Sequence, residues 1–241
     1  MDLAVALTPA ALARDDLADR AVVVIDVLRA GTTIVTALAN GARAVIPVAE
    51  EGEAGRYRAT FDRDVSFIGG ERDGKPLAGY DAGNSPAEYT EAAVAGRTVV
   101  LTTTNGTAAL VHARGARRVA AGAFVNASAL AGFLRQALDD GLGAVILCSG
   151  WRGAVSLEDT LCAGLLVDLV AGGASGLGDG AQIAYGLYRG AKSDLARALV
   201  AAEHTRRLVA LGAADDVARC AQIDTTDTLP VFRDNQLVAA G

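Results

Sequence analysis

The chain of 241 residues has few aromatic residues, only two histidines and no excess of positive charge. Aromatic side chains make up 5% of the chain, which argues against a platform on which nucleic acid bases stack. Lys and Arg number 22 against 28 Asp and Glu, a net charge of -6, whereas a nucleic-acid-binding protein normally has a basic face. We therefore expect no nucleic acid partner, although a few local arginines can still bind a small anion.

Cysteines and long apolar runs are also scarce. Three cysteines without close spacing argue against a disulfide framework and favour a reducing compartment. The apolar runs are far shorter than the roughly 20 residues of a membrane helix. No basic segment accompanies the first apolar patch, so we expect neither a secretory signal nor a membrane span. These features predict a cytoplasmic protein without a membrane partner.

The chain is rich in apolar residues, at 51%, with 21% charged, which excludes intrinsic disorder. Short β-branched runs alternate with alanine-rich helical stretches, a pattern typical of a largely parallel sheet covered on both faces. The predicted fold class is α/β. Expected strands are residues 3–7, 21–25, 44–48, 65–68, 98–102, 118–121 and 144–148. Expected helices are residues 9–17, 33–39, 50–60, 86–93, 107–113, 127–138 and 157–170.

The pattern changes in the last third of the chain. Residues 172–180 are a glycine-rich loop, residues 179–211 predict two or three helices, and residues 223–238 predict short strands around Pro230. We expect one domain over residues 1–241, with a helical extension at 172–222. Gly164 inside the helix at 157–170 predicts a close backbone approach.

Polar residues follow several expected strands at the point where each strand ends. They are Asp26 after AVVVI, Glu71 after SFIGG, Thr103 to Asn105 after TVVLT, and Ser149 after AVILC. In open parallel sheets the ligand crevice lies beyond the carboxyl ends of the strands. Four such positions predict one shared site.

The segment VIDVLRAGTT combines a carboxylate, an arginine and a helix start, with Thr32 or Thr33 as the expected N-cap. Arg29 can bind a phosphate or sulfonate, and Asp26 can hold a divalent metal through oxygen. The alternative is structural: a capped helix beside an Asp26–Arg29 ion pair. The residues alone leave both open.

The segment GGERDGKPLAGYDAGNSP is a long glycine-rich loop, and ordered loops of this length are often functional. Candidate metal ligands or acid–base groups are Glu71 and Asp81, and candidate anion-binding groups are Arg72 and Lys75. Ser85, followed by Pro86 and Glu88, matches a capping box and is better explained as a helix cap. Asn84 has no such structural explanation and stays a candidate.

Two further strand–helix junctions carry polar residues. In TVVLTTTNGTAAL, the hydroxyls and the glycine at Thr103 to Gly106 form a plausible phosphate cradle, or an ordinary helix start capped by Thr104 or Asn105. After residue 148, Trp151 and Arg152 lie in a glycine-flanked loop that can close over a ligand. Ser156 predicts a helix N-cap, which would explain Glu158 and Asp159 through the helix dipole.

The sequence lacks the motifs of several phosphate chemistries. No G-x-x-x-x-G-K-[ST] P-loop occurs. Cys148 and Arg152 do not have the spacing of cysteine phosphatases, and Leu28 stands where haloacid-dehalogenase-type enzymes carry a second Asp. His112 and His204 are far apart, so we expect no histidine-based metal site or catalytic triad. Carboxylate, hydroxyl and arginine chemistry remains, which suits Mg²⁺ and phosphoryl groups.

At these same segments the sequence resembles the 2-phosphosulfolactate phosphatase family. The matching stretches are DVLRAGTTIVTALANGA, GGERDGKPLAGYDAGNSPAEYT, TVVLTTTNGTAAL, GAFVNASAL and SLEDTLCAGLLVD, in the family's order. The resemblance implies a three-layer α/β/α fold and Mg²⁺-dependent hydrolysis of 2-phospho-3-sulfolactate to 3-sulfolactate and phosphate, a step toward coenzyme M in methanogens. It implies a site containing Asp26, Arg29, Glu71, Arg72, Asn84, Asn105 and Asp159. The chain departs from the family at Gly31, where a threonine is usual, and this change is either harmless or marks another substrate.

These observations combine into one predicted site. The expected catalytic residues are Asp26, Arg29, Glu71 and Asp159, with Mg²⁺ held by Asp26, Glu71 and Asp159. The expected substrate-binding residues are Arg72, Asn84, Thr103, Thr104, Asn105, Gly106, Cys148, Ser149 and Arg152. Asp26 and Cys148 are the candidate nucleophiles if water does not attack directly. Two alternatives stay open: a phosphatase of another small phosphorylated 2-hydroxy acid, and a non-catalytic anion-binding regulatory protein. A homodimer is also compatible with the composition.

Overall fold

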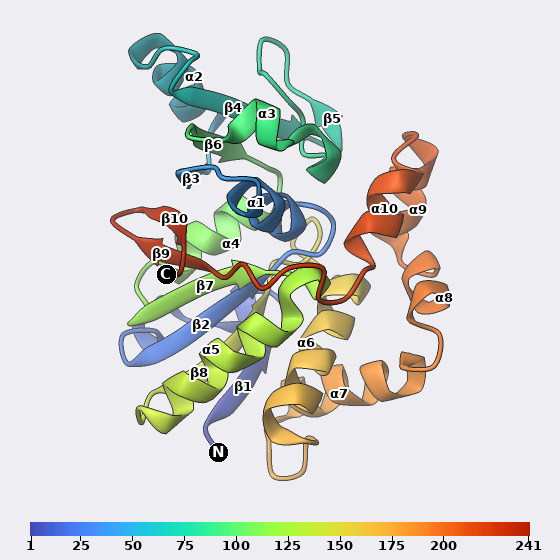
Figure 1. Ribbon diagram of the computed structural model, residues 1–241. Helices are drawn as coiled ribbons and strands as arrows, with labels where there is room; N and C mark the ends of the chain where they lie inside the picture. The colour runs from blue at the N-terminus through green and yellow to red at the C-terminus, as the bar shows by residue number, and fades with distance from the viewer.

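A ten-stranded sheet runs through the protein (Figure 1). The computed structural model describes residues 1–241, apart from the side chain of Arg14. One part of the sheet is parallel and contains, in spatial order, β1 (Leu3–Ala6), β8 (Gly143–Cys148), β2 (Arg20–Ile25) and β7 (Arg118–Gly122). A second parallel part contains β3 (Ala44–Val48), β6 (Thr98–Thr102) and β4 (Ser66–Arg72), with the short antiparallel β5 (Lys75–Pro76) at its edge.

The C-terminal hairpin joins the two parallel parts. Its strands β9 (Pro230–Arg233) and β10 (Gln236–Ala239) are antiparallel, and both residues of the turn, Asp234 and Asn235, have positive φ, which these residue types tolerate. β9 pairs antiparallel with β7, and β10 pairs antiparallel with β3. The predicted short strands around Pro230 are confirmed, and the sheet is mixed.

Helices cover both faces of the sheet, as the α/β prediction requires. Along β2, Val23 and Ile25 point to the face that α5 (Ala127–Asp139) and α6 (Leu157–Ala171) cover. Val22 and Val24 point to the opposite face, which α1 (Ala30–Ala39) and α4 (Gly106–Ala113) cover. The short helix η4 (Phe124–Asn126) leads into α5, and α2 (Glu51–Thr60) packs on the second parallel part. No helix in the described chain has both the length and the apolar content to cross a bilayer.

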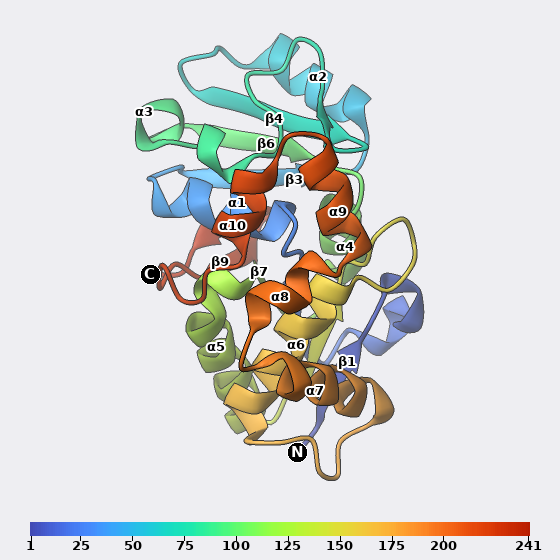
Figure 2. The same ribbon diagram turned by 90° about the vertical axis from the view of Figure 1, so that its right-hand side faces the viewer.

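The last third of the chain forms the helices α7 (Asp179–Ala191), α8 (Leu195–Val200), α9 (Glu203–Ala210) and α10 (Ala214–Cys220). The first three confirm the helices predicted for residues 179–211. α7 packs closely on α6, and a Cβ at Gly164 would overlap the Ala184 carbonyl, so the predicted close approach is also confirmed. Figure 2 shows α8, α9 and α10 running from α7 toward α1 along one side of the molecule. The assignment of residues 1–241 to one domain stays a prediction.

Two predicted helices were wrong as continuous elements. Residues 9–17 form two short 3₁₀ turns, η1 (Pro9–Ala11) and η2 (Arg14–Asp16), because the alanines of this segment stay exposed and supply no packed face. Residues 86–93 divide into η3 (Pro86–Glu88) and α3 (Glu91–Val94). Tyr89 interrupts them because its fully buried ring packs on Phe67 while its hydroxyl donates to the Gly83 carbonyl.

Candidate active site

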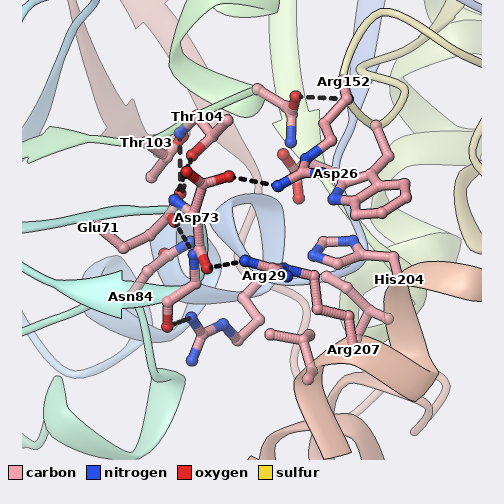
Figure 3. A pocket seen from close by; sticks show the side chains of 15 residues that line it. Asp26, Arg29, Glu71, Asp73, Asn84, Thr103, Thr104, Arg152, His204 and Arg207 are labelled. Atoms are coloured by element: carbon pink, nitrogen blue, oxygen red, sulfur yellow. Dashed lines mark hydrogen bonds and ion pairs between the residues drawn. The ribbon is translucent and has the colours of Figure 1, made fainter. Parts of the chain in front are cut away.

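A polar pocket lies where the carboxyl ends of strands from both parts of the sheet meet α9 (Figure 3). Eight of its lining residues were predicted for the site: Asp26, Arg29, Glu71, Asn84, Thr103, Thr104, Asn105 and Arg152. Trp151 also lines it, from the loop that was expected to close over a ligand. The six remaining lining residues were not predicted: Leu28, Asp73, Gly74, His204, Arg207 and Leu208. The prediction that separate strand ends share one site is therefore supported by the geometry.

Asp26 follows β2 directly and sits at the N-terminus of α1. Its Oδ1 accepts a hydrogen bond from the Ala30 N–H at 3.1 Å, and its Oδ2 lies against Gly106. Only 7% of the residue is exposed. This burial raises the pKa of Asp26 to about 7, and among the nearby charges His204 opposes the rise most strongly. Asp26 thus combines a pKa near neutrality with access to the pocket.

The start of α1 differs from the prediction. The N-cap is Arg29, not Thr32 or Thr33, because Asp26 already supplies the acceptor for the first free N–H. The Thr32 hydroxyl donates instead to the Val27 carbonyl, and the Thr33 hydroxyl donates to the Asn84 carbonyl. The two threonines therefore tie neighbouring loops to the helix.

Gly31 has a packing explanation. A Cβ at this position would overlap the carbonyl oxygens of Gly122 and Asp26, and the Gly31 N–H donates to the Asp26 carbonyl at 2.8 Å. A side chain does not fit there without a shift of backbone. The departure from the family at Gly31 therefore follows from the close approach of α1 to β7 and does not require another substrate.

Arg29 projects into the pocket but does not pair with Asp26. Its Nη1 donates to Asp216 of α10 at 2.7 Å, and its Nη2 donates to the Gly74 carbonyl at 3.3 Å. The structural alternative of an Asp26–Arg29 ion pair is therefore wrong, because the C-terminal helices supply the partner carboxylate. Asp216 also accepts from Ser85 Oγ at 2.5 Å, while Glu88 accepts from the Ser85 N–H as the capping box predicts.

Glu71 lies at the end of β4 with both carboxylate oxygens occupied by protein donors. Oε1 accepts from the Thr104 N–H at 2.8 Å, and Oε2 accepts from the Gly74 N–H at 2.6 Å and from Thr104 Oγ1 at 3.2 Å. Glu71 therefore fills part of the predicted phosphate cradle itself. Its geometry is that of a brace between the β4–β5 turn and the start of α4, and it does not support metal ligation.

Asp159 also acts as a brace. Its Oδ1 accepts from the Val27 N–H at 2.9 Å, and its Oδ2 accepts from the Gly150 N–H at 3.1 Å. Burial and the charge of Asp26 raise its pKa. Asp159 does not line the pocket. The predicted metal-ligating and catalytic roles of Asp159 are not supported, because both oxygens hold the loops that follow β2 and β8.

Four predicted substrate-binding residues lie outside the pocket lining, namely Arg72, Gly106, Cys148 and Ser149. The Arg72 guanidinium donates to Thr102 Oγ1 and to the carbonyls of Glu71 and Ala49. Cys148 is fully buried, and burial raises the pKa of its thiol, which removes it as a nucleophile. Ser149 is buried, and its N–H donates to the Ile25 carbonyl at the end of β2. Gly106 provides the space that the Asp26 carboxylate occupies.

A chain of hydrogen bonds connects Asn105, Arg152, Asp73 and Arg207 along one wall of the pocket. Arg152 Nη2 donates to Asp73 Oδ1 at 2.6 Å, and the Arg152 N–H donates to Asn105 Oδ1 at 3.1 Å. Arg207 Nη2 donates to the Asp73 carbonyl at 2.9 Å (Figure 3). Asn105 occupies the N-cap position of α4, but its side chain makes no capping hydrogen bond. It instead accepts from the backbone of the loop that follows β8.

The pocket is narrow in this arrangement. Its free volume is about 20 Å³, room for about one water molecule. A second cavity of about 300 Å³ lies beside it and shares Trp151, Arg152 and His204. The Arg152–Asp73 pair is half-exposed. A three-carbon ligand therefore needs these two side chains to move.

Sequence reasoning missed the part of the site that α9 supplies. His204 is followed by Arg207 and Leu208 at the i+3 and i+4 positions, which places the three on one face of α9. This spacing was the available sequence signal for a helix face that lines the site. No strand–helix junction precedes them, so the strand-end argument does not reach them.

The described residues contain no group of three or more His, Cys, Asp and Glu that could hold a metal ion. The predicted set of Asp26, Glu71 and Asp159 is therefore not assembled as a metal site. One observation still fits a weakly held Mg²⁺: Asn84 Oδ1 is buried without a hydrogen-bond partner among the described residues. Mg²⁺ usually keeps several waters and takes one or two protein oxygens plus substrate phosphate. Asp26 Oδ2 and Asn84 Oδ1 suit that donor set.

One pocket is lined by the buried carboxylate of Asp26 and by three arginines, two from loops that follow strands and one from α9. This arrangement defines an α/β protein whose site suits small anions. The chain matches the model of the 2-phosphosulpholactate phosphatase family over residues 6–235, and it belongs to that family. The predicted family is thus confirmed, and with it the class of phosphoric monoester hydrolases.

Curated relatives agree with the family match. A protein of Symbiobacterium thermophilum named probable 2-phosphosulfolactate phosphatase is 43% identical over 227 residues, 93% of this chain and 96% of the relative. Proteins with the same name from Gloeobacter violaceus and Caldanaerobacter subterraneus subsp. tengcongensis are 42% and 38% identical, and the matches cover 86% and 90% of both chains. The alternative of a non-catalytic regulatory protein has no support in these similarities.

Proposed function

We propose that the protein is a Mg²⁺-dependent phosphatase that hydrolyses 2-phospho-3-sulfolactate to 3-sulfolactate and phosphate. The observation that carries this proposal is the grouping of the buried Asp26 with Arg29, Arg152 and Arg207 around one pocket of a chain in this family. The proposed substrate carries a phosphate, a carboxylate and a sulfonate, which calls for several cationic groups in one place. The same proposal places the enzyme in the cytoplasm, in keeping with three buried free thiols.

The arginines divide the anionic groups of the substrate between them. Arg29 lies on the same side of the pocket as Gly74 and Asn84, next to the backbone of the β4–β5 turn, and is proposed to bind the phosphoryl group together with Thr104. Arg152 and Arg207 both hold Asp73 in this arrangement. One anionic group of the substrate would replace the Asp73 carboxylate on Arg152, and the other would replace the Asp73 main-chain carbonyl on Arg207, so that both guanidinium groups make bidentate contacts. Arg207 thus takes the anion-binding role that was predicted for Arg72.

Asp26 and Asn84 are proposed to hold Mg²⁺ through Asp26 Oδ2 and Asn84 Oδ1. When bound, Mg²⁺ would neutralise charge on the phosphoryl oxygens and polarise them. Asp26 is kept in place by the Ala30 N–H and by contact with Gly106. Arg29 stabilises negative charge that develops on the transferred group, since its guanidinium is already oriented by Asp216. Of the two candidate nucleophiles besides water, only Asp26 faces the pocket.

A phosphate-release panel tests this proposal. The substrates are 2-phospho-3-sulfolactate, 2-phospholactate, which lacks the sulfonate, and glycerol 2-phosphate, which lacks both acidic groups, each with Mg²⁺ and with EDTA. We expect kcat/KM to fall at each loss of an anionic group and EDTA to abolish release. Equal rates for all three substrates would contradict the assignment of Arg152 and Arg207, and full activity in EDTA would contradict the metal.

A further inference from the structure

His204 and Glu158 form a hydrogen-bonded pair that joins α9 to the first turn of α6. His204 Nδ1 lies 3.0 Å from Glu158 Oε1, and the Glu158 side chain is 2% exposed. The dipole of α6 alone would place an acid at this position without a partner from another helix. The pair instead connects a buried carboxylate with a histidine that lines the pocket.

The imidazole ring of His204 is held by stacking on its face as well as by the contact of Nδ1 with Glu158. It stacks on Trp151 with ring centroids 5.3 Å apart and an angle of 18° between the planes. Because Glu158 occupies Nδ1, the remaining ring nitrogen is Nε2. Figure 3 shows the His204 ring directed into the pocket on the side of Asp26 and Arg152.

The charged groups around His204 come from several elements. Glu158 of α6 bonds to the ring, Asp26 faces it from the end of β2, and Arg152 and Arg207 line the same pocket from the β8 loop and from α9. Glu203 and Arg206 line the second cavity, which His204 also lines. A buried carboxylate that accepts from Nδ1 sets the tautomer and orientation of an imidazole whose Nε2 exchanges protons.

We propose that His204 is a catalytic residue of the reaction: it gives the proton on Nε2 to the oxygen that leaves phosphorus. The inference rests on the proposed function. The bond between phosphorus and the ester oxygen breaks, the electron pair stays on that oxygen, and the proton from Nε2 converts it to the hydroxyl of the released hydroxy acid. Water, attacking directly or after Asp26 has taken the phosphoryl group, supplies the oxygen of the released phosphate and gives one proton to solvent. The neutral imidazole then regains one proton from solvent, so the sum of the steps is the hydrolysis of one ester by one water. Glu158 is the positioning residue.

Such a donor is needed because the leaving group is an unactivated secondary alcohol, a poor leaving group as an alkoxide. An aryl phosphate releases a stable phenolate and has much less need of the proton. The ratio of the two activities therefore separates proton donation from a structural role of the His204–Glu158 pair.

The experiment compares His204→Asn with the wild type on 2-phospho-3-sulfolactate and on 4-nitrophenyl phosphate. The Asn amide reaches the position of Nδ1 and can keep the bond to Glu158, so the variant preserves the anchor of α9. We expect kcat to fall about 10²- to 10⁴-fold on the alkyl ester and less than about tenfold on the aryl ester. Equal losses on both substrates, or full activity on both, would overturn the proposal.

Two controls complete the design. His112→Gln changes the other histidine, whose Nε2 contacts the Leu12 carbonyl far from the pocket, and should leave both activities unchanged. In Glu158→Gln we expect the ¹⁵N chemical shifts of the His204 ring to show a different tautomer. The temperature of thermal unfolding should stay close to that of the wild type. An unchanged ¹⁵N spectrum would contradict the positioning role of Glu158. If the wild type itself releases no phosphate from the sulfolactate ester, the proposed function fails, a result distinct from a selective failure of His204.

Discussion

Arg29 Nη1 donates to Asp216 Oδ2 at 2.7 Å, and both side chains are buried although 187 residues separate them in the chain. The pair fastens α10 to the loop that follows β2. Through it the C-terminal helices become part of the site, with α9 supplying His204 and Arg207. The predicted helical extension is therefore one wall of the pocket.

Loss of the Asp216 carboxylate should be strongly destabilising. In Asp216→Ala the Arg29 guanidinium stays buried without its partner, and we expect the free energy of unfolding to fall by about 3–5 kcal/mol. Urea titration measures the change. The double variant Arg29→Ala/Asp216→Ala should lose less than the sum of the single variants.

The same variant should respond to anions. Because Asp216→Ala leaves a positive charge uncompensated at the pocket, inorganic phosphate should raise its melting temperature more than that of the wild type. Equal shifts in both proteins would mean that the Arg29 guanidinium is not available to a phosphoryl group.

The raised pKa of Asp26 predicts a pH-dependent stability. Folding favours the protonated form, so the stabilising contribution of Asp26 is complete below the unfolded pKa of 3.8 and is lost as pH rises through about 7. Asn is neutral at all these values. In metal-free buffer, the stability of Asp26→Asn relative to the wild type should therefore increase from pH 4 to pH 7 and level off above. A difference that is constant with pH would show that Asp26 ionises normally in the folded protein.

Asp159 and Asp26 should differ in their effect on metal binding. Asp159→Asn replaces one acceptor of a backbone N–H by a donor, and we expect a stability loss of about 1–3 kcal/mol with little change in Mg²⁺ affinity. The matched control is Asp168→Asn, in the same helix, whose carboxylate makes a partly exposed pair with Lys192. A large loss of Mg²⁺ affinity measured by calorimetry in Asp159→Asn would restore Asp159 as a ligand.

Gly106 should tolerate no side chain if Asp26 is positioned as described. A Cβ there would overlap Asp26 Oδ2 and lie 2.7 Å from the Ala30 Cβ. We expect Gly106→Ala to displace the carboxylate and lower kcat by about 10²-fold. Gly132→Ala, in α5 where a Cβ meets nothing within 4 Å, is the control and should retain full activity. Wild-type activity in both variants would argue against a fixed Asp26.

The strands and most of the early helices were predictable because their signals are local. Uniformly apolar runs such as AVVVI define buried strands, and the polar residue after each run marks the edge where ligands bind. The strands of the C-terminal hairpin were predicted, but their position between the two parallel parts of the sheet was not predictable. Single residue pairs such as Ala120 with Val231 depend on packing across the whole chain.

The sequence predicted many of the residues that line the site, but it did not predict the role of each residue. Asp26, Glu71 and Asp159 are all buried carboxylates near strand ends, and the sequence treats them alike. Only the structure separates them, because Glu71 and Asp159 have both oxygens bound to backbone N–H groups while Asp26 keeps one oxygen for a ligand. The pairing of His204 with Glu158 was not predictable from local sequence, because the two residues lie 46 positions apart.

The most direct measurement is phosphate release from 2-phospho-3-sulfolactate by Asp26→Asn, with circular dichroism and thermal unfolding to show that the variant is folded. The predicted result is a fall in kcat of at least about 10³-fold, since the variant loses the charged oxygen that faces the pocket. Release at the wild-type rate by the folded variant would contradict the account, because Asp26 would then have no part in the chemistry.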